Sequence, residues 1–384
     1  MKKLLIYLSV TAGLCLVFGI TSRLSVGFSE WYAMNIYPVL VTTVGRFFGF
    51  FSFSVAEIVL ILMFPGVVAG TVLFIIKMVK GKGRRRKIFL KTGICTLCIV
   101  STFLLNFILA CGINYNRRTF LYDQDISFYR TELDEWLVFQ TLLDEFHETF
   151  PNIESAIATN ADGEFRLVSD LSSSTPIAMR NLAEQFPRLQ VYYPRPKPTK
   201  FIPPLMALGF YFPLTMEANY NNTAPDGQRA MVALHELAHV AGFMREDEAN
   251  FIAFLAGRES GNPELMYAAY LFVFDNLDKL WQTQLSEERY NEFRELLPRQ
   301  IQIDLQAQNR FWFERFFDIE YIYDDYGNVI GTTETVNPVA EAVFRASETV
   351  NDAYLRTQGQ EDGILSYGRM IDLVMAVYLY EHRF

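Results

Sequence analysis

The sequence predicts a helix-rich α+β domain, residues 113–384, preceded by a membrane domain, residues 1–112, with three transmembrane helices. Three observations support this fold class. The first part contains three long runs without charged side chains, each near the roughly 20 residues that a spanning helix needs. The second part repeats its apolar residues at helical spacing. The net charge also changes sign, with 12 basic and 2 acidic residues in the first part against 22 and 41 in the second.

The three expected spans lie at about 4–22, 57–77 and 91–113. The first of them could instead be a cleaved signal peptide, because Met1-Lys2-Lys3 followed by an apolar run fits both interpretations. The sequence favours an uncleaved signal anchor, since no small-x-small cleavage site stands near Ser22.

The orientation in the membrane follows from the positive charges. The stretch 77–91 holds eight basic residues and no acidic one, so it is expected on the cytoplasmic side. In this multi-pass arrangement residues 113–384 lie outside the cytoplasmic membrane. Residues 24–56 are rich in aromatic side chains and are expected on the outer surface, with a short re-entrant helix. The expected partner is the lipid bilayer, whereas the acidic second part argues against nucleic acid, whose phosphates need Lys and Arg.

The second part is expected to combine helices with a few short strands. Met206–Leu214 is apolar and aromatic and predicts a strand, which Pro213 confines to the edge of its sheet. The Pro- and Tyr-rich stretch 187–204 indicates extended chain, and the turn residues 324–328 indicate a small hairpin. Helices are expected at 131–150, 225–241, 246–257, 263–282, 339–357 and 366–381.

The segment His235-Glu236-Leu237-Ala238-His239 carries the strongest chemical signal. On a helix its two histidines lie one turn apart on the same face, where both imidazoles can reach one Zn²⁺. Glu236 lies beside them and can accept a proton from water. The surrounding stretch 231–241 has no other charged residue, and a lone carboxylate in an apolar helix is costly without a partner. The pattern therefore predicts a zinc site with a general base.

The third ligand is expected in the acidic stretch that follows this helix. Gly242 can end the helix in a left-handed turn, which would bring residues 243–250 back toward the metal. Glu246 and Asn250 are four residues apart and share a helix face, so Glu246 can bind the metal while Asn250 orients a ligand histidine. Glu248 is the alternative ligand, and the sequence favours Glu246.

Two further pairs of residues are candidates for substrate binding and catalysis. Glu217 and Asn219 can line a cleft in which the preceding edge strand aligns a peptide substrate by strand addition. A core strand and turn is an equally good interpretation of that segment. Near the end of the chain, Tyr367 and Arg369 can stabilise an oxyanion if they face the metal.

Three motifs together resemble a known family. HELAHxxGFxxExEANF, preceded by YFPxTxEANxN and followed by DGxxSYGRxxD, is similar to a family of bacterial multi-pass membrane proteins of unassigned function, over nearly the whole chain. The spacing also resembles the ExxxD element of gluzincin metallopeptidases, with Asn250 in place of Asp, and the His-x-x-Gly turn resembles that of metzincins. This resemblance implies a zincin-like domain in which His235 and His239 are zinc ligands and Glu236 is the catalytic base.

These features predict a membrane-anchored zinc metallopeptidase that cleaves peptide or protein substrates outside the cytoplasmic membrane. One alternative is a non-catalytic, zinc-stabilised sensor or scaffold, against which Glu236 argues because a structural zinc site needs no base. Another is a zinc amidase that acts on cell-wall material. A third possibility is the inverted topology, which would place the site in the cytoplasm.

Overall fold

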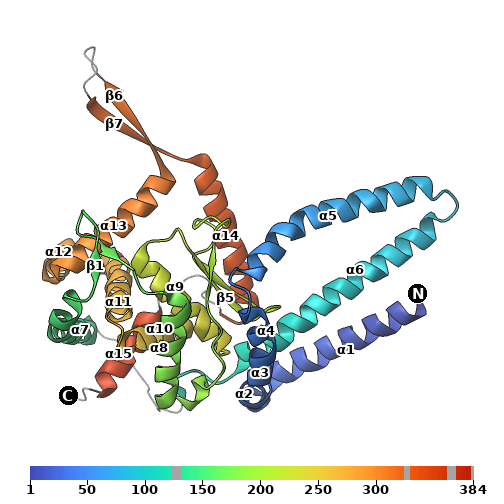
Figure 1. Cartoon of the computed structure of the whole chain (residues 1–384), viewed down its shortest axis with the longest axis horizontal. Helices are drawn as coiled ribbons and strands as arrows, with labels where there is room; N and C mark the ends of the chain where they lie inside the picture. The colour runs from blue at the N-terminus through green and yellow to red at the C-terminus, as the bar shows by residue number, and fades with distance from the viewer. Residues whose placement is uncertain (123–131, 324–328, 361–368, 382–384) are drawn as a thin grey trace.

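The computed structural model describes residues 1–122, 132–323, 329–360 and 369–381. Three of its helices are long and apolar enough to cross a membrane, as predicted. They are α1 (Lys2–Leu24), α5 (Val55–Lys80) and α6 (Arg85–Phe107), and they extend from one side of the molecule (Figure 1). The last of them continues through the short turns η2 (Ile108–Gly112) and η3 (Asn114–Asn116).

Helices α1 and α6 pack against each other along their length. Hydroxyl side chains form hydrogen bonds between the two helices. Thr11 Oγ1 and Ser101 Oγ are 2.8 Å apart, and the hydroxyl oxygens of Tyr7 and Thr102 are 2.7 Å apart. Such pairs hold neighbouring helices together where lipid supplies no hydrophobic driving force.

Residues 25–54 connect the first two long helices and form what we call the connecting segment. It contains α2 (Val26–Asn35), α3 (Tyr37–Leu40), the π-helical turn η1 (Val41–Gly45) and α4 (Arg46–Gly49). Its aromatic residues divide between two environments. Tyr32 and Tyr37 are buried in the same hydrophobic core as the C-terminal domain, whereas Trp31 and Phe50 are exposed. The connecting segment therefore joins the long apolar helices to the domain.

The domain is built around three mutually packed helices, α9 (Asp226–Val240), α10 (Glu246–Arg258) and α11 (Pro263–Gln284). All three contribute small or aromatic side chains to the core, among them Ala233, Phe254 and Tyr270, all fully buried or nearly so. Around this core lie α7 (Glu132–Glu154), the β1–β2 hairpin (Ala158–Thr159 and Phe165–Arg166), α8 (Leu171–Gln185), η5 (Pro187–Leu189), α12 (Glu287–Leu296), α13 (Arg299–Phe316) and α15 (Met370–Glu381). The helix-rich α+β class is confirmed.

A small sheet covers α9, in the order β3-β5-β4. β3 (Lys197–Thr199) runs parallel to β5 (Glu217–Asn221), and β4 (Gly209–Phe212) runs antiparallel to it with Tyr211 opposite Ala218. The predicted strand in Met206–Leu214 is thus β4, and it lies at the sheet edge as Pro213 required.

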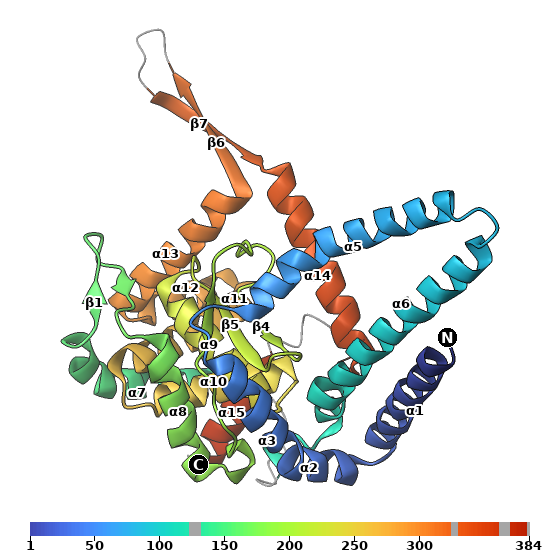
Figure 2. The same cartoon turned by 45° about the vertical axis from the view of Figure 1, so that its right-hand side comes forward.

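A long hairpin and one further helix lie apart from the domain core. β6 (Phe317–Tyr323) pairs antiparallel with β7 (Val329–Val336), and α14 (Pro338–Thr357) follows. The predicted turn at 324–328 lies outside the described residues. Turned by 45°, the structure shows α14 descending from the hairpin to the region where α6 joins the domain (Figure 2).

Candidate metal centre

Helix α9 presents His235 and His239 one turn apart, with their ring centroids 4.6 Å from each other. The helix ends at Gly242, whose φ of +85° lies in the left-handed region that favours glycine. The amide of Phe243 then donates to the carbonyl of Ala238, which closes the turn. The predicted reversal at Gly242 is confirmed, and it brings the start of α10 back to the two imidazoles.

Glu246, the first residue of α10, faces both histidines. Its Oε2 lies 3.1 Å from Nε2 of His235 and 3.6 Å from Nε2 of His239. Within the described residues these three side chains form the one group of at least three potential metal-binding residues, with ligand atoms within 4.8 Å of one another. Two ligands held tetrahedrally at 2.0–2.1 Å from one zinc ion lie about 3.3–3.4 Å apart. The observed separations fall on either side of that value.

Each imidazole places its Nδ1 against an oxygen acceptor and its Nε2 toward Glu246. Nδ1 of His239 is 2.7 Å from the carbonyl oxygen of Phe243, and Nδ1 of His235 is 2.6 Å from Oδ1 of Asn250. Because both partners are acceptors, each Nδ1 carries a proton, and the neutral form of each ring, which metal binding requires, then has its lone pair on Nε2. Asn250 therefore orients His235 as the sequence suggested.

Glu246 supplies the third candidate donor atom, Oε2. Glu246 is buried, and its Oε2 accepts no hydrogen bond. Burial alone would lower the pKa of His239 and raise that of Glu246, but their mutual attraction outweighs it. The pKa of His239 is consequently raised, and that of Glu246 is held well below its ordinary value. The Glu246 carboxylate is therefore anionic, and once the imidazoles release their Nε2 protons the three side chains form a buried donor set that suits a divalent cation such as zinc.

Glu248, the alternative ligand, points elsewhere. Its carboxylate accepts a hydrogen bond of 2.8 Å from the amide of Phe120. Burial raises the pKa of Glu248 to about 7. The structure thus brings Glu246 to the histidines and gives Glu248 a role in anchoring the chain that follows the third span.

Glu236 lies beside the histidines, enclosed by α9 and the sheet. It is 4% exposed and accepts a hydrogen bond from the amide of Tyr211 in β4, while its Oε2 has no partner. Burial raises the pKa of Glu236 to about 7, although His235 and His239 oppose the rise. A carboxylate with a pKa near neutrality can both accept and return a proton.

Gly209 allows β4 to approach this carboxylate. A Cβ at this position would lie 2.7 Å from Oε1 of Glu236 and 2.8 Å from the carbonyl oxygen of Asn219. Only glycine fits so close an approach of a strand to a side chain. Gly209 lies within the strand predicted at Met206–Leu214, but the sequence did not indicate that this strand would face Glu236 of α9.

Arg117 supports the turn after α9. Its guanidinium donates to the carbonyls of Ala241 and Gly242 at 3.3 and 3.4 Å, and it stacks 4.2 Å from the ring centroid of Phe243. Arg117 is also paired with Glu30 of the connecting segment at 3.2 Å. Phe243, whose carbonyl orients His239, is thereby linked through Arg117 to the connecting segment, which the sequence did not indicate.

The carboxyl end of α14 also reaches the centre. Gln360 accepts a hydrogen bond of 3.4 Å from the amide of Glu246, and its own Nε2 is buried without a partner. The hydroxyl of Tyr354 accepts a bond of 2.9 Å from that of Tyr115. Burial raises the pKa of Tyr354, and the Glu246 carboxylate adds to the rise. No local pattern in the sequence distinguished these residues.

The other predicted site residues lie in different surroundings. Glu217 accepts hydrogen bonds from the amides of Val55 and Ala56 at 3.1 and 2.7 Å, so it caps α5 rather than lining a cleft. Asn219 is fully buried and donates to main-chain carbonyls of β4 and β5. The Arg369 guanidinium lies 3.6 Å from the carboxylate of Asp247. Tyr367 lies outside the described residues.

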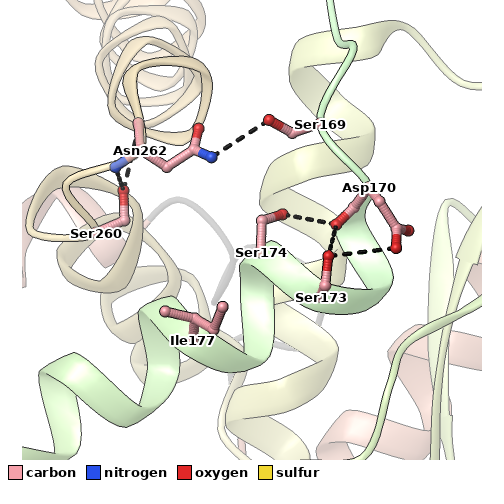
Figure 3. Close-up of a pocket in the computed structure, with 7 residues that line it drawn as sticks. All are labelled: Ser169, Asp170, Ser173, Ser174, Ile177, Ser260 and Asn262. Carbon is pink, nitrogen blue, oxygen red and sulfur yellow. Dashed lines mark hydrogen bonds between the residues drawn. The ribbon is translucent and has the colours of Figure 1, made fainter.

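A surface cavity of about 250 Å³ beside the amino end of α8 is separate from this centre (Figure 3). Ser173 and Ser174 donate their hydroxyls to Asp170, and Asn262 donates to Ser169. These serines already serve local structure, and none of the candidate metal ligands lines the cavity. Its lining residues are Ser169, Asp170, Ser173, Ser174, Ile177, Ser260 and Asn262.

Comparison with known proteins adds one finding. A family model described as "Protein of unknown function (DUF3810)" matches residues 32–375. The chain belongs to this family. The region that matches DUF3810 contains most of the connecting segment, the second and third long helices and all of the candidate metal centre. No curated protein and no solved structure matches the chain. The membrane helices and the α+β class therefore stand on the structure itself, and a zincin-like fold stays a prediction.

Proposed function

We propose that this DUF3810 protein is a membrane-anchored zinc-dependent hydrolase, and specifically a metallopeptidase. One observation carries the proposal: two imidazoles and one buried carboxylate converge at 3.1 and 3.6 Å, next to a second buried carboxylate that takes no part in the cluster. The cluster is suited to hold a metal, and the separate carboxylate is suited to proton transfer. A purely structural zinc site would not need the latter.

The roles follow from the positions of the side chains. His235, His239 and Glu246 would hold the zinc ion. Bound there, zinc would act as a Lewis acid toward a carbonyl group and would lower the pKa of a water molecule. Glu236 would accept the proton of the attacking water and pass it to the leaving amine. The position of Glu236, buried beside the cluster but outside it, supports this role.

The proposed location is the outer side of the cytoplasmic membrane. The loop between α5 and α6 belongs to the basic stretch 77–91, which favours the cytoplasm. The domain lies at the opposite ends of these helices (Figure 1). Labelling of intact cells at a cysteine introduced in 113–384 tests the side, and labelling that requires cell lysis would reverse the orientation.

Zinc content and hydrolysis together test the function. The purified full chain should contain one equivalent of zinc and cleave a mixture of unstructured peptides. Glu236→Gln should retain the zinc and lose hydrolysis by roughly 10²–10⁴-fold, as expected for removal of a general base. Glu248→Gln is the matched control, because it changes another buried glutamate of the same region, and it should retain both properties. Full hydrolysis by Glu236→Gln would refute the proposed chemistry.

A further inference from the structure

Helix α14 carries an apolar stripe that the rest of the described structure leaves exposed except at Val343, which is half-buried. The stripe consists of Val339, Val343, Ala346, Val350 and Ala353, whose spacing of four and three residues places them on one face of the helix. Val339 and Val350 are each 70% exposed. The charged residues of α14 gather on another face, roughly opposite to the stripe: Glu341, Arg345, Glu348, Asp352 and Arg356.

The position of α14 relates this stripe to the membrane helices. Both views show α14 running across the region between the domain and the long helices, in a direction different from theirs (Figures 1 and 2). At its carboxyl end, the Tyr354 ring packs edge-on against Phe107 of α6, with centroids 6.1 Å apart. The lower end of α14 is therefore level with the end of the third span.

Exposed apolar side chains continue from the stripe to the start of the second span. Ser347 of α14 donates a hydrogen bond of 2.6 Å to the carbonyl of Met206, which is 52% exposed. Phe201 of the same loop is 75% exposed, and its amide donates at 2.7 Å to Glu57 in the first turn of α5. The apolar band thus runs from one span across the loop 200–206 to α14 and on to another span.

We propose that α14 is an interfacial helix whose apolar stripe lies in the lipid headgroup region on the domain side of the bilayer. Three features favour lipid as the occupant. The band is continuous with the membrane helices at both ends, so the bilayer surface is already at this level. An amphipathic helix with its charges opposite a valine and alanine stripe suits a shallow position in the plane of the interface. The lipid would also cover Phe201 and Met206, which a partner helix seated on the stripe alone would leave exposed.

This arrangement also bears on the metal centre. Gln360, three residues after α14, accepts a hydrogen bond from the amide of Glu246, so the candidate centre would lie close to the membrane surface. The membrane contact of α14 does not depend on the proposed hydrolysis and can be tested without metal or substrate.

Spin labels measure the position of the stripe directly. The full chain is first freed of its four cysteines, Cys15, Cys95, Cys98 and Cys111, all of which are free thiols, and its unfolding temperature is compared with that of the parent. Val350→Cys and the control Arg345→Cys are then labelled with a nitroxide and reconstituted in vesicles of phosphatidylcholine and phosphatidylglycerol. The Arg345 side chain is 74% exposed on the charged face. The ratio of oxygen to nickel-chelate accessibility should be several-fold higher at position 350 than at position 345.

Equal ratios at the two positions would overturn the proposal. A dipolar distance between Val350→Cys labels of two molecules, with low accessibility to both quenchers, would also overturn it, because the occupant would then be a second copy of the chain. If the cysteine-free protein unfolds, tryptophans serve instead in the parent chain. Val350→Trp should then emit fluorescence that brominated lipid quenches several-fold more strongly than the fluorescence added by Arg345→Trp, and equal quenching would refute the interfacial position.

Discussion

Replacing Asn250 by alanine should weaken zinc binding without touching a candidate ligand. Oδ1 of Asn250 lies 2.6 Å from Nδ1 of His235 and so holds the proton on that nitrogen and the lone pair on Nε2. The alanine variant leaves the Nδ1 proton without this acceptor in a site where Asn250 is only 8% exposed. The ring is then free to rotate or to change tautomer, and either change removes a donor atom from the metal.

The size of the effect can be worked from this single contact. Loss of a group that orients a metal ligand typically lowers affinity by about 10–100-fold, which corresponds to about 1.4–2.7 kcal/mol. A buried donor left without a partner costs a similar amount, about 1–3 kcal/mol. Asn250→Asp keeps an acceptor oxygen at the same place and adds a charge that strengthens the histidine as a ligand. The aspartate variant should therefore bind zinc at least as tightly as the parent, and the parent should bind it much more tightly than the alanine variant.

Competition with a chromophoric chelator measures this order on the purified full chain in detergent. The unfolding temperatures of the metal-free proteins provide the control for general damage to the fold. An alanine variant that binds zinc within twofold of the parent would refute the orienting role of Asn250. An aspartate variant weaker than the alanine variant would refute the assignment of the Nδ1 proton to His235.

Three other expectations follow from contacts outside the ligand set. Gly209→Ala should retain zinc and lose most hydrolysis, because the added methyl group would lie 2.7 Å from Oε1 of Glu236. Zinc content and peptide cleavage are measured on the same preparation, and normal values of both would contradict this expectation. Glu217→Ala should lower the free energy of unfolding by about 1–3 kcal/mol, since it removes two charge-assisted hydrogen bonds from the start of α5, and zinc affinity should not change. Glu248 has a pKa raised from 4.5 to about 7 in the fold, so the stability that it contributes is fully present below pH 4.5 and declines up to pH 7. From pH 4.5 to pH 7 the free energy of unfolding of Glu248→Gln, measured with urea, should therefore rise relative to that of the parent, by at most about 3 kcal/mol. Parallel pH profiles of the two proteins would contradict the raised pKa of Glu248.

Much of the fold could be predicted because its signals are local. The spans are uncharged runs about 20 residues long, and the helices around the centre show their period within one or two turns. The turn at Gly242 and the edge position of β4 likewise depend on a single glycine and a single proline. Helices α8, α12 and α13 were not predicted, because polar residues interrupt their apolar faces. These apolar residues can be recognised as one face only once the helices are packed against the core.

The candidate site divides in the same way. His235, Glu236 and His239 share one helix turn, so their relation is a property of the α-helix itself. Choosing between Glu246 and Glu248 requires the direction of α10 relative to α9, which depends on how the turn packs against Arg117 and Phe243. Glu217 was expected in a cleft because it is a polar residue beside a predicted strand. The amides of α5 that it caps lie more than 150 residues away in the chain, so the sequence could not indicate that contact.

The sequence by itself determined three apolar spans, a helix-rich acidic domain and a histidine–glutamate helix suited to zinc chemistry. These properties arise from hydropathy, charge and helical periodicity, all of which act between residues a few positions apart. Only the tertiary structure decided that Glu246 faces the two histidines, that Glu236 is enclosed by β4, and that α14 returns to the centre beside the third span. Those relations join residues separated by about 10 to 240 positions, and they depend on packing and burial, which a linear pattern does not encode.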